Sequence, residues 1–157
     1  MIIDNHLLDT LSSQAKANPR LRQAYDLRNG ENDNSQRMLN ALEPGTVMPI
    51  HRHRKTSESI CMVRGKMIMR LYDDNGNVTD EFVMAPTSLH SLPSIQEGEC
   101  NEPTIPMVHV EASQWHLLEV LEEGTVVFEA KDGKYELLPE EDIMKYILIS
   151  RKSKHQM

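Results

Sequence analysis

Turn residues divide the chain from residue 36 onward into short segments, and this feature constrains the fold more than any other. The strongest turn is Asp73-Asp74-Asn75-Gly76-Asn77, because an Asn-Gly pair accepts the positive φ values that hairpin turns need. Many short strands between Gly and Pro turns are typical of a closed barrel or jelly roll. We therefore predict an all-β fold with strands at 37–43, 46–53, 57–63, 66–72, 78–84, 107–110, 116–119 and 125–130.

The N-terminal residues have a different pattern, which predicts a helix over residues 5–17. Leu7, Leu8 and Leu11 share one helical face, Asp4 can cap the start of the helix, and Pro19 can end it. We also expect a short helical turn at 19–25, a polar loop at 28–35 and a last helix at 139–149. The predicted organisation is an arm at 1–35, a barrel at 36–136, and a C-terminal helix and tail at 137–157. The polar segment at 86–103 is predicted to be an insertion or a lid.

The amino-acid composition disfavours nucleic acid and membrane as partners of this protein. The chain has 157 residues and a net charge of −7, which disfavours nucleic acid because binding to phosphates needs a basic surface. No apolar stretch approaches the ~20 residues that cross a bilayer, and the first residues lack the pattern of a secretory signal. The two cysteines, Cys61 and Cys100, form no metal or disulfide pattern. We expect a cytoplasmic protein that binds neither nucleic acid nor membrane.

The segment Gly45-x5-His51-x-His53-x4-Glu58-x6-Gly65 predicts a metal site. Side chains alternate along a strand, so His51 and His53 point to the same face. A bend after His53 lets Glu58 return to that face on the next strand. The alternative is a basic, exposed His-Arg-His-Arg stripe, but the shared spacing of five residues favours a metal.

A third imidazole has to come from elsewhere, and His116 is the best candidate because it lies on a late strand. The alternative for His116 is a barrel-wall histidine bonded to backbone, and His90 and His109 are rival ligands. Three imidazoles and a carboxylate suit one divalent ion of iron, manganese, nickel, zinc or copper, between which the donor set does not choose. Octahedral coordination by these four residues leaves two open positions.

The spacing of His51, His53 and Glu58 is the first cupin motif, and the chain resembles the WbuC-type cupin-fold metalloproteins over about residues 3–136. The residues that carry the resemblance lie at 35–45, 51–53, 58, 73–78, 115–116 and 124–135. It implies a jelly-roll barrel with a divalent metal and a setting among genes for bacterial surface polysaccharides. It implies no established reaction.

The second cupin motif departs from the usual Pro-x-Gly-x-x-His, because this chain has Glu111-Ala112-Ser113-Gln114-Trp115-His116. Val120 replaces a common Asn, and Arg28 and Lys134 also depart from the family pattern. These changes put the shape of the turn in doubt and leave the ligand in place.

Several other residues have two interpretations. Arg37 and Asn40, just before the motif, are candidates to bind a substrate hydroxyl or phosphate, and the alternative is an exposed pair on an edge strand. Trp115 is expected to pack on the face opposite His116. The methionines are expected to fill the core; they include Met62, Met67, Met69 and Met84.

These observations predict a metal-binding cupin that binds or acts on a small, polar, anionic, sugar-like compound, such as a nucleotide sugar. One hypothesis is an isomerase, epimerase or lyase in which the metal is a Lewis acid. The others are a metal-dependent sugar-binding module without turnover and an iron-dependent oxygenase. We also predict a homodimer, because an open barrel edge favours pairing.

Overall fold

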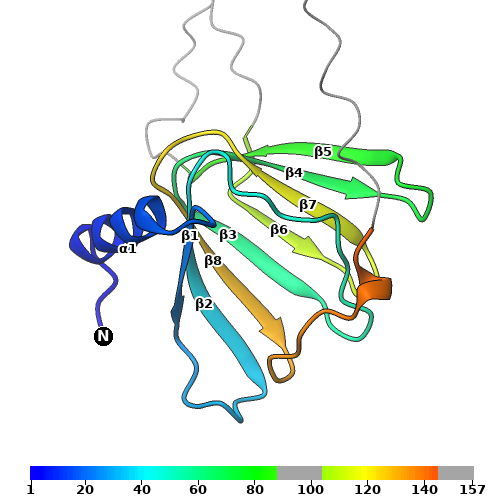
Figure 1. Cartoon of the computed structure of the whole chain (residues 1–157), viewed down its shortest axis with the longest axis horizontal. Coiled ribbons are helices and arrows are strands. Elements are labelled where there is room, and N and C mark those ends of the chain that lie inside the picture. The colour runs from blue at the N-terminus through cyan, green and yellow to red at the C-terminus, as the bar shows by residue number, and fades with distance from the viewer. Residues whose placement is uncertain (88–103, 145–157) are drawn as a thin grey trace, which may run out of the picture.

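The computed structural model describes residues 1–87 and 104–144, which form two antiparallel sheets and an N-terminal helix (Figure 1). The larger sheet has the strand order β1-β2-β8-β3-β6, and the smaller sheet has the order β5-β4-β7. The elements are α1 (Asn5–Ala17), β1 (Arg22–Asp26), β2 (Ser35–Leu42), β3 (Glu58–Arg64), β4 (Met67–Tyr72), β5 (Val78–Met84), β6 (Met107–Val110), β7 (Trp115–Val120), β8 (Thr125–Asp132) and a 3-10 helix (Glu140–Asp142). The all-β jelly roll with an N-terminal helix is confirmed.

The main core fills the space between the two sheets. Met62 of β3 and Val127 of β8 come from the larger sheet, and Met69 of β4 and Leu118 of β7 come from the smaller one. Met67, Met69 and Met84 are fully buried, as predicted for methionines that fill the core. Alternate residues of each strand are apolar and face the other sheet. Burial of these two apolar faces against each other holds the two sheets together.

Helix α1 covers the outer face of the larger sheet. Leu8, Leu11 and Ala15 pack against Leu39 and Val126 of that sheet. The carboxylate of Asp4 accepts a hydrogen bond from the backbone N–H of Leu7 at 3.0 Å, which caps the helix as predicted. Helix α1 therefore covers the outer face of the larger sheet, and the site lies on the inner face.

Two local predictions are wrong. Residues 22–26 form strand β1, paired with β2 from Arg22↔Leu42 to Asp26↔Met38, where a helical turn was expected. Tyr25 packs under α1, so burial against the helix and pairing with β2 outweigh local helix propensity. Residues 46–53 form no strand apart from one bridge at His51, because Pro49 has no N–H for a strand ladder. The other predicted strands agree with the structure to within two residues at each end.

Two turns set the register of the barrel. In the predicted hairpin, Gly76 has φ 81°, and the carboxylate of Asp73 accepts from the backbone N–H groups of Asn75 and Asn77. Gly65, between β3 and β4, also has φ 81°, and a Cβ there would lie 2.7 Å from Cα of Thr125. Glycine is required at this second turn both by its backbone conformation and by this close approach.

The chain after β8 returns to the barrel. The helix predicted at 139–149 is wrong in its described part, since the 3-10 helix stops at Asp142 and Ile143 is extended and bridged to His51. Residues 145–149 of that prediction, and residues 88–103 of the predicted insertion, lie outside the described residues. Within the part that the structure describes, no helix is long and apolar enough to span a membrane.

Candidate metal centre

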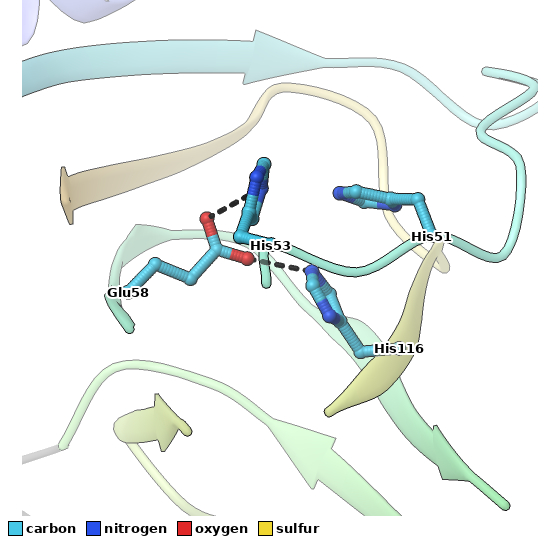
Figure 2. Close-up of side chains that lie close together, drawn as sticks. All are labelled: His51, His53, Glu58 and His116. Atoms are coloured by element: carbon cyan, nitrogen blue, oxygen red, sulfur yellow. Dashed lines mark ion pairs between the residues drawn. The ribbon is translucent and has the colours of Figure 1, made fainter. Parts of the chain in front are cut away.

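The side chains of the four predicted ligands lie close together (Figure 2). His51 and His53 come from the extended segment before β3, Glu58 is the first residue of β3, and His116 is the second residue of β7. One donor atom from each residue lies within 4.8 Å of the other three. An ion bound at about 2.0–2.3 Å from nitrogen and oxygen donors needs them at about this mutual distance. The four residues could therefore hold a metal ion.

Backbone pairing between His51 and His116 holds the centre together. The N–H of His51 donates to the carbonyl of His116 at 3.1 Å, and the N–H of His116 donates back at 2.9 Å. The N–H of Ser113 donates to the carbonyl of His53 at 2.7 Å. These bonds attach the segment that carries the first two ligands to the strand that carries the third, so the ligand positions depend on barrel closure.

Two backbone carbonyls fix the orientation of two imidazoles. Nδ1 of His51 lies 3.1 Å from the carbonyl of Pro49, and Nδ1 of His116 lies 3.0 Å from that of Gln114. A carbonyl only accepts, so Nδ1 carries the proton in both rings, and Nε2 of the neutral ring has a free lone pair. This arrangement orients an imidazole for coordination through Nε2.

Nε2 of His116 is the atom that most needs a cation. It is buried and has no hydrogen-bond partner, although Oε1 of Glu58 lies 2.6 Å away. When His116 is protonated, this contact is an ion pair with the Glu58 carboxylate. The other carboxylate oxygen of Glu58 lies 3.7 Å from Nε2 of His53. Lone pairs facing each other at these distances are stabilised by a metal ion or by a proton.

The charge states in this cluster suit a metal. Burial lowers the pKa of His51 and of His53 to about 4, so both rings are neutral at pH 7. Burial opposes ionisation of Glu58, but the surrounding histidines outweigh it, His116 above all, and hold its pKa at about 2. Burial also opposes protonation of His116, but the Glu58 carboxylate outweighs it and raises the pKa of His116. An ion would replace that proton.

The opposite face of the ligand segment is clamped by the C-terminal residues. The buried carboxylate of Asp142 accepts from Nε of Arg52 at 3.0 Å and from Nε of Arg54 at 2.5 Å. Arg52 also stacks on Trp115, with its guanidinium carbon 4.3 Å from the ring centroid. Trp115 is buried against Ile50, which confirms its predicted packing role. The clamp therefore holds the two arginines that alternate with the histidines along the ligand segment.

The sequence also suggested two substrate-binding residues and two rival metal ligands, and those among the described residues have no described contact with the four clustered ligands. Asn40 donates from Nδ2 to Glu129 at 3.0 Å. Arg37 pairs with Asp33 at 2.8 Å and has no described contact with the four ligands. His109 is half exposed on β6 and contacts Ser59, so the structure keeps it out of the cluster. His90 lies outside the described residues.

Sequence reasoning missed two charged residues beside the centre. Nζ of Lys131 lies 3.3 and 3.4 Å from the two ring nitrogens of His53. Burial, followed by the charge of Glu58, raises the pKa of Glu129 to about 7. The available signal was their spacing, because Glu129 and Lys131 are two apart and therefore share one face of β8.

The fold and the site define a cupin-type jelly roll. Residues 3–84 match the model of a family described as "Domain of unknown function (DUF6016)", and the chain belongs to this family. A search of curated proteins gave no significant match.

Solved structures show the same fold at low sequence identity. KdgF from Halomonas sp. is 11% identical, with a TM-score of 0.53 over 75% of this chain and 84% of that one. The Cnp3 cupin domain of Schizosaccharomyces pombe is 10% identical, with a TM-score of 0.50 over 72% of this chain and 65% of that one. A variant of Bacillus subtilis oxalate decarboxylase is 16% identical, with a TM-score of 0.51 over 76% of this chain. The match spans only 27% of the decarboxylase chain. At identities of 10–16%, these likenesses establish the fold alone.

Proposed function

We propose that this protein holds one divalent metal ion through His51, His53, Glu58 and His116, and that it acts on a small, polar, sugar-like compound at that ion. The observation that carries the proposal is the buried Nε2 of His116, which lies 2.6 Å from Oε1 of the buried Glu58 carboxylate. The tautomers that the carbonyls of Pro49 and Gln114 impose support it further.

The donor set suits iron, manganese, nickel, zinc or copper, and octahedral coordination by four residues leaves two positions for water or substrate. When bound, such an ion supplies a Lewis acid that polarises a carbonyl or hydroxyl of the substrate. Glu129, whose carboxyl lies on the inward face of β8 beside the centre, is the candidate proton carrier of the chain itself. This carboxyl favours isomerase, epimerase or lyase chemistry over binding without turnover.

The setting in bacterial surface polysaccharide synthesis rests on the resemblance to WbuC-type cupins and remains part of the proposal. Asn40 stays a candidate substrate contact, because it lies beside Glu129. Arg37 stays a prediction that its described contacts do not support. The cytoplasmic location and the homodimer are also predictions. Light scattering tests the dimer, and a mass near 18.0 kDa at high concentration would contradict it.

Metal content tests the proposal directly. Protein purified without oxygen should contain close to one equivalent of a single transition metal by plasma mass spectrometry. His53→Ala should lose most of it, because each ligand contributes directly to affinity. The matched control is His109→Ala, which removes an exposed imidazole away from the cluster and should keep the metal. A His53→Ala protein that retains a full equivalent of tightly bound metal would overturn the assignment.

A further inference from the structure

One inward-facing strip of β8 carries charged residues next to the candidate metal centre. Lys131 lies opposite Glu58, and Glu129 lies opposite Ile60, in the pairing of β8 with β3. Directly opposed residues of an antiparallel pair share a face, and Ile60 belongs to the core inside the barrel. Glu129 and Lys131 therefore face the barrel interior on the same side as the metal ligand Glu58.

Lys131 has no carboxylate within ion-pair distance among residues 1–87 and 104–144. Lys131 is a half-buried residue, and the described contacts of its ammonium group are the two ring nitrogens of His53. The neighbouring arginines are already paired: Arg52 and Arg54 with Asp142. Glu58 and Glu129 lie near Lys131 but not within ion-pair distance, so the ammonium group is available to an anionic ligand.

The charge balance of the interior points to an anionic ligand. A divalent ion at the centre would exceed the charge of Glu58, and Lys131 adds to that excess. Glu129 reduces the excess only when ionised. A bound anion would therefore lower the electrostatic free energy of the loaded barrel, whereas a neutral ligand would leave it unchanged.

Glu129 and Asn40 are polar groups that can bind a hydroxyl of the ligand, in addition to the anionic group that Lys131 can bind. The Glu129 carboxyl is half-buried and accepts from Nδ2 of Asn40 at 3.0 Å. A carboxyl in this position can accept from or donate to a ligand hydroxyl according to its protonation state. The strip thus offers a cation and a hydroxyl-binding pair on one side of the metal centre.

We propose that Lys131, Glu129 and Asn40 form a subsite for a hydroxylated organic anion, with Lys131 on the anionic group and the Glu129–Asn40 pair on a hydroxyl. The subsite deepens the proposed function and rests on it, because it adjoins the metal centre. A sugar acid has both groups, and a sugar phosphate has a related anion. The shared chemistry is one anionic group on a polyhydroxy skeleton.

Calorimetry on the full-length protein loaded with its metal tests the subsite. The probes are glucuronate, glucose 6-phosphate and glucose, which separate the carboxylate, the phosphate and the neutral skeleton. At least one of the two anions should bind about tenfold or more tightly than glucose, because a charge-assisted contact discriminates by that amount. Lys131→Met should remove this preference, and Lys131→Arg should retain it.

The matched control is Lys134→Met, which removes an exposed ammonium that contacts Asn32 and should leave the preference unchanged. Metal affinity is the second readout. Lys131→Met should hold metal at least as tightly as the wild type, because the change removes a cation next to His53. A merely structural role for Lys131 would weaken metal binding.

Three results would overturn the subsite: no preference for either anion, an unchanged preference in Lys131→Met, or metal loss in that variant. The first two leave the metal centre standing if the wild type is metal-loaded. Failure of the wild type to take up metal overturns the proposed function instead, and the same probes on metal-free protein then still test whether anion binding depends on Lys131.

Discussion

The interior of the barrel is polar at one end and apolar at the other, although the same strands build both. On the inward face of β3, Glu58 is followed by Ile60 and Met62, and on that of β7, His116 is followed by Leu118. Strand β8 runs the other way and passes from the core to Glu129 and Lys131. Because residues two apart share a face, a strand changes from core to site without any change in its backbone.

The comparison separates stability from function. The apolar end buries methionine and aliphatic side chains, which stabilises the fold. The polar end removes Glu58 and His116 from water, which costs free energy unless a cation satisfies them. Changes at the apolar end should therefore alter stability and leave metal binding intact, and changes at the polar end should do the reverse.

The largest expected effect on stability is at the apolar end. Met69→Ala should lower the free energy of unfolding by about 2–5 kcal/mol, because it leaves a cavity at a fully buried position. Urea denaturation of the metal-free protein measures this loss, and the metal content per folded protein should not change. Met107→Ala is the matched control, because Met107 is 50% exposed. Equal losses in the two variants would contradict the assignment of the core.

The next effect is the stabilisation by the metal itself. An ion that binds only the folded protein adds about 4 kcal/mol when its free concentration is a thousand times its Kd. Thermal unfolding with and without the metal should show this increment in the wild type and, undiminished, in Met69→Ala. His53→Ala should lose it. An increment that also disappears in Met69→Ala would mean that the two ends are not independent.

Asp142 tests whether the polar end depends on support from outside the barrel. Asp142→Asn removes the charge that holds Arg52 and Arg54, which lie between the histidines on the ligand segment. Loss of a direct partner of a ligand weakens metal binding about 10–100-fold, and Asp142 acts one residue further out, so we expect a loss of up to about tenfold. Competition with a chelator measures the change, and Glu141→Gln, at an exposed neighbouring position, is the control. Equal affinities in the two variants would show that backbone pairing alone positions the ligands.

The sequence was sufficient for the parts of the molecule that depend on local spacing. The spacing of His51, His53 and Glu58 and the Asn75-Gly76 hairpin are each contained within one short segment, so the cupin spacing and turn chemistry predict them, although residues 46–53 form no continuous strand. His116 was found because the motif required one more imidazole from a late strand.

The parts that depend on register could not be predicted. Glu129 and Lys131 join the site through the pairing of β8 with β3, and no local pattern sets that pairing. Asp142 reaches Arg52 and Arg54 because the chain after β8 returns to the ligand segment. Strand β1 was missed because its pairing with β2 and its burial under α1 outweigh its local propensity.

The last effect depends on pH and concerns Glu129, where the two ends meet. Burial raises its pKa from 4.5 to about 7, followed in size by the charge of Glu58, whereas Lys131, His116 and the hydrogen bond from Asn40 lower it. Between pH 4.5 and pH 7 the unfolded chain loses the proton that the native protein keeps. The contribution of Glu129 to stability is therefore complete below pH 4.5 and is lost as the pH rises through 7.

Glu129→Gln should remove that loss, which amounts to at most about 3 kcal/mol and less for a partly exposed group. Its melting temperature should therefore rise relative to that of the metal-free wild type between pH 5 and pH 8, whereas the exposed-site control Glu122→Gln should follow the wild type. Bound metal should reduce the difference, because a nearby cation favours the ionised carboxylate. Parallel curves for Glu129→Gln and the wild type across this range would mean that Glu129 is solvated like a surface carboxylate and does not belong to the polar end.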